Sequence, residues 1–325
     1  MAPGKLKGGT ASIGMGSIDN SRWTLGLRFN LLVILGPTAS GKTKIGVQIA
    51  RALDGEIISA DSRQVYRGMD IGTGKDLIEY GSIPYHLIDI VNPGHEFNVF
   101  EFQRRFLEAF SEIQSHGRIP ILVGGTGMYL DAVLRGYRLR EVPENPKLRK
   151  ELALLSIENL AARLQGANPK LHNTTDLLDR ERLTRAIEIA EFSGERDQPL
   201  PPLPELMPIV FGIRFDRKIL RQRITQRLRD RLNRGMIEEV EELIRKGVSF
   251  ETLEFYGLEY RFVALYLKGE LSRNDMFQKL NSAIHQFARR QETWFHRLER
   301  QGIPIHWVDG NVDPATTILQ RLKDS

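Results

Sequence analysis

The sequence predicts an α/β fold in three layers, with a central parallel sheet between two layers of helices and an inserted helical subdomain. Short apolar segments alternate with helical patterns along the chain, which is typical of a parallel sheet covered on both faces. A glycine-rich loop joins the first apolar segment to the first helical pattern, and a long helical stretch separates the fourth segment from the fifth. The helical stretch between the fourth and fifth segments is the predicted inserted subdomain.

Five apolar segments are the expected strands. They are residues 31–36, 56–61, 86–90, 119–125 and 209–215. Three of them end in residues useful for binding: Gly36 with the loop behind it, Asp61 with Ser62, and Gly125 with Thr126. Ligands of parallel sheets bind outside the carboxyl ends of the strands. We therefore expect these three loops to converge on one crevice.

The loop "GPTASGKT" follows the G-x-x-x-x-G-K-[ST] pattern, so the predicted fold is a P-loop three-layer fold. Its backbone N–H groups and the positive end of the next helix bind anions. Lys42 adds a charge on the outer phosphate, and the Thr43 hydroxyl is placed to bind Mg²⁺. The motif fits a nucleoside triphosphate such as ATP and equally another diphosphate ester. The expected phosphate-binding residues are Gly36, Pro37, Thr38, Ala39, Ser40, Gly41, Lys42 and Thr43.

Composition limits the class of protein. The chain of 325 residues is 41% hydrophobic, which is enough for a large core, and its formal net charge of +5 is a mild excess. There are no cysteines, which excludes disulfides and thiolate metal sites and fits a reducing compartment. No apolar run approaches the roughly 20 residues that a membrane span requires. We expect a soluble, cytoplasmic, monomeric protein with no membrane partner.

The chain is expected to divide into four segments. They are a disordered tail at 1–29, a P-loop catalytic core with C-terminal helices at 30–138 and 206–312, and between its halves an inserted helical subdomain at 139–205. The tail has no apolar region of the kind that secretory signals carry. A misplaced start codon and a transit peptide are the alternatives to disorder for this segment.

The insertion carries the patterns "KLRKELALLSIENLAARLQG" and "DRERLTRAIEIAEFSG" and closes in the proline-rich stretch "DQPLPPLPELMP". In the second pattern Leu183, Ile187 and Ala190 share one helical face, and Gly194 is the expected C-cap. Three arginines crowd one end of this helix, namely Arg180, Arg182 and Arg185. They are either solvated surface or contacts to a polyanion.

Six segments together resemble the tRNA dimethylallyltransferases, in order and in spacing. They are "GPTASGKT", "SADSRQVYRGMDIGTGK", "VGGTGMYL", "DRERLTRAIEIAEFSG", "RQRITQRL" and "FARRQETWF". The resemblance covers residues 31 to 309. It implies transfer of a dimethylallyl group from dimethylallyl diphosphate, with Mg²⁺, to N6 of the adenosine next to the anticodon of tRNAs that read codons beginning with U. It also implies that the P-loop holds the diphosphate of the prenyl donor and that the partner is a tRNA anticodon stem-loop.

Ionisation of an allylic C–O bond leaves charge on diphosphate, and the enzyme must stabilise that charge. The P-loop amides, Lys42, and Mg²⁺ on Thr43 are suited to this. Arg223 and Arg227 form an i, i+4 pair at the edge of an apolar helical stripe. The resemblance assigns both to the diphosphate, whereas the pattern alone also fits ordinary arginines on a helix surface.

The nucleophile is an amine whose lone pair is delocalised into adenine, so a base must accept its proton as the bond forms. Asp61, at the carboxyl end of the second expected strand, is the expected base. Its alternatives are an aspartate that holds magnesium through water and a helix N-cap. Thr126 forms the opposite wall, where its hydroxyl can contact donor or adenine. The expected catalytic residues are Asp61, Thr126 and Arg223.

Residues on several loops and helices are expected to contact tRNA. In "FARRQETWF" an apolar stripe that includes Phe287 and Gln291 is typical of a core face, whereas Arg289 and Arg290 are available to a phosphate backbone. Tyr66 is a further candidate on the loop after Asp61. The expected tRNA-binding residues are Asp61, Ser62, Arg63, Gln64, Thr126, Arg182, Arg185, Tyr260, Arg261, Arg289 and Arg290.

Two positions depart from the pattern of the family. Glu259 stands where the family usually carries a glycine before a Tyr-Arg pair, and Phe262 follows that pair. Asp76 replaces the proline that usually follows the lysine at Lys75. A carboxylate beside an RNA path repels phosphates, so Glu259 bears on how the anticodon loop is held.

Three alternatives to a tRNA prenyltransferase stay open. A related enzyme that prenylates free AMP shares the chemistry, and the inserted subdomain and the basic C-terminal helix argue against it. A P-loop kinase of a small metabolite would use the same loop from Gly36 to Thr43 and form ADP from ATP. A catalytically silent RNA-binding paralogue would lose the site, but Lys42, Thr43 and Asp61 are all present.

Overall fold

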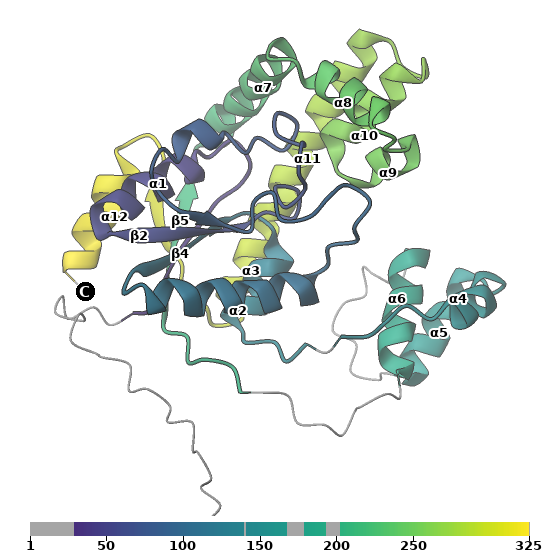
Figure 1. Ribbon diagram of the computed structural model, residues 1–325, viewed down its shortest axis with the longest axis horizontal. Helices are drawn as coiled ribbons and strands as arrows, with labels where there is room; N and C mark the ends of the chain where they lie inside the picture. Colours follow the sequence, from purple (N-terminus) through teal and green to yellow (C-terminus); the bar gives the residue numbers. More distant parts are fainter. Residues whose placement is uncertain (1–28, 140, 168–178, 193–201, 325) are drawn as a thin grey trace, which may run out of the picture.

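A six-stranded sheet forms the centre of the protein in the computed structural model, which describes residues 29–139, 141–167, 179–192 and 202–324 (Figure 1). All of its paired strands are parallel, in the order β3-β2-β4-β1-β5-β6. The strands are β1 (Leu31–Leu35), β2 (Gly55–Ala60), β3 (Tyr85–His86), β4 (Ile119–Gly124), β5 (Pro208–Arg214) and β6 (His306–Asp309). The predicted α/β class and parallel sheet are confirmed.

Helices cover both faces of the sheet. The core helices are α1 (Lys42–Leu53), α2 (Val99–Ser115), α3 (Gly127–Leu134), α7 (Arg217–Asn233), α8 (Met236–Arg245), α9 (Phe250–Phe255), α10 (Leu258–Leu267), α11 (Arg273–Arg300) and α12 (Pro314–Lys323), with a short 3-10 turn at Leu77–Glu79. Leu32 and Ile34 pack with α1 and α12, whereas Leu31 and Val33 pack with α2, α3 and α11. Every residue of β1 is buried, so its sequence is a continuous apolar run. No helix in the described ranges is long and apolar enough to cross a membrane.

Two strands differ from the expectation. The segment 86–90 was expected to be a strand, but only Tyr85–His86 pair with β2. Leu87 and Asp89 have positive φ angles of 64° and 54°, so the chain turns there and the Asp89 carboxylate accepts a hydrogen bond from Lys75. The sixth strand, β6, was not expected, because only four residues form it at the sheet edge.

One residue of the predicted tail lies in the core. Phe29, assigned to the disordered tail, is a core residue with 5% exposure that packs with β1 and α1. The rest of that predicted tail, 1–28, lies outside the described residues.

The inserted segment has its own small apolar cluster. Its helices are α4 (Pro146–Ala153), α5 (Ile157–Ala167) and α6 (Arg180–Glu191), and they lie to one side of the sheet (Figure 1). The first predicted pattern is thus two helices, and α6 ends before Gly194, which lies outside the described residues. The buried residues of the cluster are Leu152, Leu160, Leu164, Leu183 and Ile187. The domain boundaries stay a prediction.

Candidate active site

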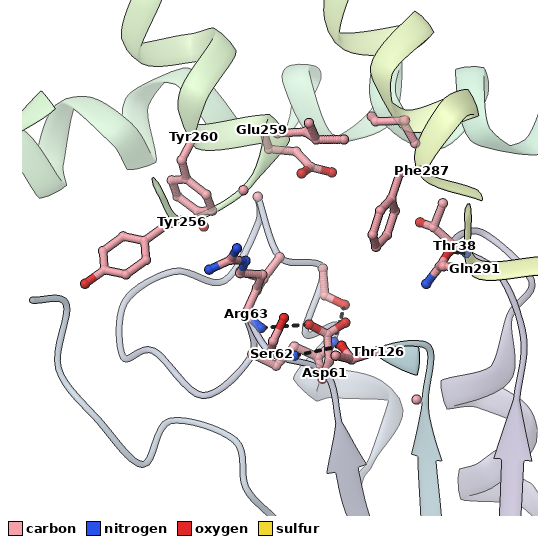
Figure 2. A pocket seen from close by; sticks show the side chains of 18 of the residues that line it. Thr38, Asp61, Ser62, Arg63, Thr126, Tyr256, Glu259, Tyr260, Phe287 and Gln291 are labelled. Atoms are coloured by element: carbon pink, nitrogen blue, oxygen red, sulfur yellow. Dashed lines mark hydrogen bonds between the residues drawn. The ribbon is translucent and has the colours of Figure 1, made fainter. Parts of the chain in front are cut away.

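A cavity of about 470 Å³ opens at the carboxyl edge of the sheet, between the loops that follow the strands and the C-terminal helices (Figure 2). The loops after β1, β2 and β4 contribute Thr38, Lys42, Thr43, Asp61, Ser62, Arg63 and Thr126. Helices α7, α10 and α11 contribute Arg227, Arg231, Glu259, Tyr260, Phe287, Arg290 and Gln291. The structure therefore brings the three predicted loops to one cavity, and it closes that cavity with helices from the second half of the chain.

The P-loop joins β1 to α1 with two residues in the left-handed region, Ala39 at φ 63° and Gly41 at φ 80°. A Cβ atom at Gly36 would lie 2.7 Å from Ser40 Oγ and 3.2 Å from the Ile213 carbonyl oxygen, so a side chain there would crowd the loop. Lys42 begins α1, and its Nζ lies 3.5 Å from the Pro37 carbonyl. Burial lowers the pKa of Lys42 to about 8, with Arg227 as a further cause. A desolvated cation beside further cations gains free energy when an anion binds.

Arg223 and Arg227 reach the P-loop region from α7 in different ways. Arg223 Nε donates to the Ala39 carbonyl at 2.9 Å, and its guanidinium lies over the Phe215 ring. It therefore braces the outside of the P-loop rather than lining the cavity. Arg227 does line the cavity, and it donates to the Gly74 carbonyl at 3.4 Å.

Asp61 and Thr126 lie side by side at the carboxyl ends of two neighbouring strands (Figure 2). The Asp61 carboxylate accepts a hydrogen bond from Arg63 N at 2.9 Å, and Thr126 Oγ1 accepts one from Ser62 N at 3.1 Å. No helix in the described chain begins at Asp61, so the N-cap interpretation fails. The carboxylate faces a cavity that also contains Lys42, which leaves proton transfer and magnesium binding as its possible roles.

The predicted RNA contacts fall into two groups. Several line the cavity, namely Ser62, Arg63, Gln64, Arg182, Tyr260, Arg261 and Arg290. Two of these also make internal contacts: Gln64 Oε1 accepts from Ser59 Oγ at 2.9 Å, and Tyr260 Oη donates to Glu239 at 2.7 Å. Arg185 donates to Glu188 at 3.1 Å and to the Val142 carbonyl at 2.7 Å. The Tyr66 side chain is 1% exposed, and Arg289 lies exposed on α11 outside the cavity.

Gln291, which the sequence suggested as part of a core face, links two of the loops. Its Oε1 accepts from Thr38 N at 2.8 Å, and its Nε2 donates to the Gly125 carbonyl at 2.9 Å. Phe287, assigned to the same core stripe, is instead 39% exposed and lines the cavity. A lone glutamine on an apolar helical face was the available signal, because a buried amide requires hydrogen-bond partners.

Glu239 was missed altogether. Its carboxylate accepts hydrogen bonds from three successive backbone N–H groups, those of Asp70, Ile71 and Gly72, at 2.8, 2.6 and 2.9 Å. It therefore fixes the loop that carries Gly74 against the cavity. No signal in the charged sequence of α8 distinguishes Glu239 from its glutamate neighbours.

Known proteins resemble the chain over almost its whole length. The IPP transferase family model matches residues 64–298, and the isopentenyl transferase model matches residues 29–80. "tRNA dimethylallyltransferase 1" of Geotalea uraniireducens is 71% identical over 294 residues, which cover 90% of this chain and 97% of that protein. The chain belongs to the tRNA dimethylallyltransferase family. The full-length tRNA isopentenylpyrophosphate transferase of Bacillus halodurans has the same fold, with a TM-score of 0.66 at 32% identity over 91% of this chain and 95% of that one.

A eukaryotic dimethylallyltransferase acting on tRNA shares the fold as well, with a TM-score of 0.72 at 24% identity. That structure covers 89% of this chain, and this chain covers 77% of that one. Like its relatives, the chain is therefore a member of a prenyltransferase family with a P-loop α/β core.

The two departures from the family pattern are both paired with arginines in α7 or at its C-terminal end. Asp76 accepts from Arg227 at 3.2 Å and from Arg234 at 3.4 Å, and Glu259 accepts from Arg231 at 3.1 Å. Burial opposes ionisation of Asp76, but Arg227 and its neighbours outweigh it and lower the pKa of the carboxyl group. Glu259 is thus a carboxylate in an ion pair with Arg231 rather than an isolated negative charge.

The donor groups at the cavity fit a divalent ion held mainly by substrate. No cluster of three acidic or histidine side chains in the described part of the chain can hold a metal. Thr43 and Asp61 nevertheless line the same cavity and offer a hydroxyl and a carboxylate. Mg²⁺ is usually held by one or two such oxygens together with phosphates and water, so a site of this composition suits it.

Proposed function

We propose that this protein transfers the dimethylallyl group of dimethylallyl diphosphate to N6 of the adenosine next to the anticodon, in tRNAs that read codons beginning with U. The observation that carries the proposal is the meeting of Asp61 and Thr126 with the P-loop in one cavity. Membership in the tRNA dimethylallyltransferase family supports it.

The donor side is an anion site. When the bond between the allylic carbon and the diphosphate oxygen breaks, its electron pair stays on the pyrophosphate. The P-loop amides, Lys42 and Arg227 face that charge, and Arg223 holds the P-loop in shape through the Ala39 carbonyl. Mg²⁺ on the Thr43 hydroxyl would neutralise further charge on the leaving group when bound.

On the acceptor side, the reaction needs a general base and a group that positions the adenine or the donor. As N6 bonds to the allylic carbon, its proton passes to the Asp61 carboxylate, which is preorganised by the backbone N–H of Arg63. The Thr126 hydroxyl beside it is positioned to hold the adenine or the donor. Because its own hydrogen bond is accepted from Ser62 N, the Thr126 hydroxyl proton is available to a substrate atom.

The charge of the cavity favours a nucleic acid over a free nucleotide. Its cationic lining residues are Lys42, Arg63, Arg182, Arg227, Arg231, Arg261 and Arg290, against the carboxylates Asp61, Glu254 and Glu259. Arg182 comes from the inserted segment, so that segment extends the basic surface beyond what AMP can cover. We assign residues 139–205 to tRNA binding on this basis. Monomeric state and cytoplasmic location stay predictions from the sequence.

The test is incubation with labelled dimethylallyl diphosphate, Mg²⁺ and one of three acceptors: an unmodified anticodon stem-loop, AMP, or the same stem-loop with inosine in place of the target adenosine. Inosine lacks the N6 amine, so it is the matched negative control. We expect label only in the unmodified stem-loop. Label in AMP alone overturns the acceptor, and formation of ADP from ATP without label transfer identifies a kinase.

A further inference from the structure

Asp76 has a backbone conformation that the proline usual at this position in the family cannot adopt. Its φ angle is 46° and its ψ angle is 47°, in the left-handed region. The proline ring fixes φ at about −65°, whereas aspartate is one of the few residues besides glycine that enter the left-handed region readily. The chain therefore turns at Asp76 as a proline would not allow, and the carboxylate reaches Arg227 of α7 and Arg234 at the C-terminal end of that helix.

The loop that precedes Asp76 is fixed by charged side chains. Glu239 accepts hydrogen bonds from the three successive backbone N–H groups of residues 70–72. The side chain of Lys75 is 0% exposed, and its Nζ donates to the Asp70 carboxylate at 2.6 Å. Asp76 follows directly on this anchored segment, so its carboxylate has little freedom to move away from α7.

Arg227 is held by hydrogen bonds at one of its nitrogens. Nη2 donates to the Asp76 carboxylate at 3.2 Å and to the Gly74 carbonyl at 3.4 Å. Within the described ranges no hydrogen bond engages Nε or Nη1, although Arg227 lines the cavity. Asp76 is not among the residues that line it. The carboxylate thus contacts the guanidinium from outside the cavity, and the other N–H donors are available to an anion inside it.

The cations around Arg227 repel it. Burial lowers the pKa of Arg223 and of Arg231, and the charge of Arg227 lowers both further. These pKa shifts express unfavourable interactions between like charges. Asp76 opposes the repulsion, because its carboxylate forms an ion pair with Arg227 in which the two side chains are only 26% and 30% exposed. An arginine under such repulsion is better ordered when a carboxylate holds it.

We propose that Asp76 is a positioning residue for Arg227, and that it holds the guanidinium in place to bind the diphosphate of the prenyl donor. This rests on the proposed function, in which Arg227 faces that diphosphate. A side chain that is ordered before binding loses less conformational entropy when the ligand arrives. Repulsion between Asp76 and the diphosphate is the smaller effect, because the carboxylate lies outside the cavity. Asp76 therefore increases the affinity for the donor.

Two other roles for Asp76 lead to different results. If the carboxylate only ties the loop to α7, its loss lowers thermal stability and leaves donor affinity at the wild-type value. If it mainly cancels the charge of Arg227, its loss makes the cavity more positive and strengthens donor binding. Only positioning leads to weaker donor binding that depends on the presence of Arg227.

The experiment measures the dissociation constant of dimethylallyl diphosphate by calorimetry, and its KM and kcat at saturating tRNA, for wild type and Asp76→Asn. Asparagine tolerates the left-handed backbone and keeps the size of the side chain, so the substitution removes the charge. We expect the dissociation constant and KM to rise by roughly 3- to 10-fold, the cost of ordering one long side chain. At saturating donor kcat should keep its wild-type value, because bound diphosphate orders Arg227 in either protein. Asp76→Gly, which also accepts this backbone conformation, should weaken donor binding at least as much.

The double variant Asp76→Asn, Arg227→Gln separates positioning from a structural role. Arg227→Gln alone should weaken donor binding, and addition of Asp76→Asn should then change nothing further. Arg234→Gln is the matched control, since Arg234 is the other partner of Asp76 and does not line the cavity; its donor affinity should equal that of wild type.

The inference is overturned by unchanged or stronger donor binding in Asp76→Asn, by wild-type donor binding in Arg227→Gln, or by an equal further loss in the double variant. An equal loss in Arg234→Gln overturns it as well, because that result would reflect net charge rather than the position of Arg227. Absence of label from every RNA with wild type overturns the proposed function instead.

Discussion

The two walls of the cavity are built on different principles. On the strand side, Asp61, Thr126 and the P-loop follow parallel strands of fixed register, and the side chains of Asp61 and Thr126 accept hydrogen bonds from backbone N–H groups. On the helix side, the buried Arg231 of α7 donates to the Gly72 carbonyl and to Glu259 of α10, so it joins both helices to the loop at Gly72–Gly74. The first wall therefore depends on local strand geometry, and the second depends on contacts between segments that lie far apart in the sequence.

The largest predicted effect on turnover is that of a substitution at Asp61, in the strand wall. Asp61→Asn keeps the shape and the acceptor for Arg63 N but removes the proton acceptor, so turnover should fall by roughly 10²–10⁴. Donor binding should be nearly unchanged, because the P-loop is untouched. Single-turnover rates at saturating tRNA, with donor affinity measured separately, check this. Near-normal turnover would refute the assignment of Asp61 as the base.

Lys42→Ala tests the anion site of the same wall. Loss of a charged hydrogen-bond donor should weaken dimethylallyl diphosphate binding by roughly 10- to 100-fold, while tRNA affinity without donor stays at the wild-type value. Titration of each ligand by calorimetry gives both numbers. Stronger thermal protection by ATP than by dimethylallyl diphosphate would contradict the donor assignment.

The pKa of Lys42 adds a dependence on pH. Burial lowers it to about 8, below the unfolded value, so the free site loses its proton as pH rises through 8. A bound diphosphate favours the charged form, so binding above that pH requires uptake of a proton. Donor affinity should therefore be constant below pH 8 and weaken above it by up to about tenfold per pH unit. Lys42→Ala should remove this dependence, and its persistence would point to another group.

Gln291 connects the two walls. Gln291→Leu should leave Thr38 N and the Gly125 carbonyl without their partner, at a cost of about 1–3 kcal/mol in the free energy of unfolding for each unsatisfied group. Donor affinity should fall with it, because the P-loop is no longer tied to the loop after β4. Urea unfolding followed by circular dichroism measures the first effect. A Gln286→Leu variant, exposed on the same helix, should retain wild-type stability.

The smallest predicted effect is on the salt dependence of tRNA binding, and it should differ between two arginines of α6. Arg182 lines the cavity, and its loss should reduce the slope of log K against log salt for tRNA by about 0.7 to 0.9. Arg185 is engaged with Glu188 and the Val142 carbonyl, so Arg185→Ala should leave the slope unchanged and lower thermal stability instead. Titrations at two salt concentrations distinguish them, and equal slopes for both variants would remove Arg182 from the RNA path.

The sequence carried most information about the wall of strands. Asp61 and Thr126 follow apolar segments directly, and the P-loop has a fixed spacing, so local pattern was enough to place them at the carboxyl edge of one sheet. The helix wall depends on contacts over long sequence separations. Arg231 differs from its neighbours on α7 only through its contact with Glu259 and Gly72, and neither partner is near it in sequence.

In the fold, too, features set by local sequence pattern were predicted and features set by distant contacts were not. Long buried strands such as β1 and β4 were recognisable from their apolar runs, but the segment after His86 was misread. Leu87 and Ile88 are buried, so they look like strand residues, yet Leu87 and Asp89 have positive φ angles and the Asp89 carboxylate accepts a hydrogen bond from Lys75. Contacts between segments separated in sequence leave no periodic signal.

The hydrogen bond between Thr38 and Gln291 spans 253 residues of sequence, and it has a consequence for biosynthesis. Thr38 leaves the ribosome early, with the first strand of the sheet, whereas Gln291 leaves near the end of translation. Contacts of such separation form late, since a long loop must close first. The backbone N–H of Thr38 therefore lacks its partner Gln291 until most of the chain has been synthesised. A nascent chain stalled before α11 would lack both β6 and the partner of Thr38 N, so we expect it to bind the donor less tightly than the full chain does.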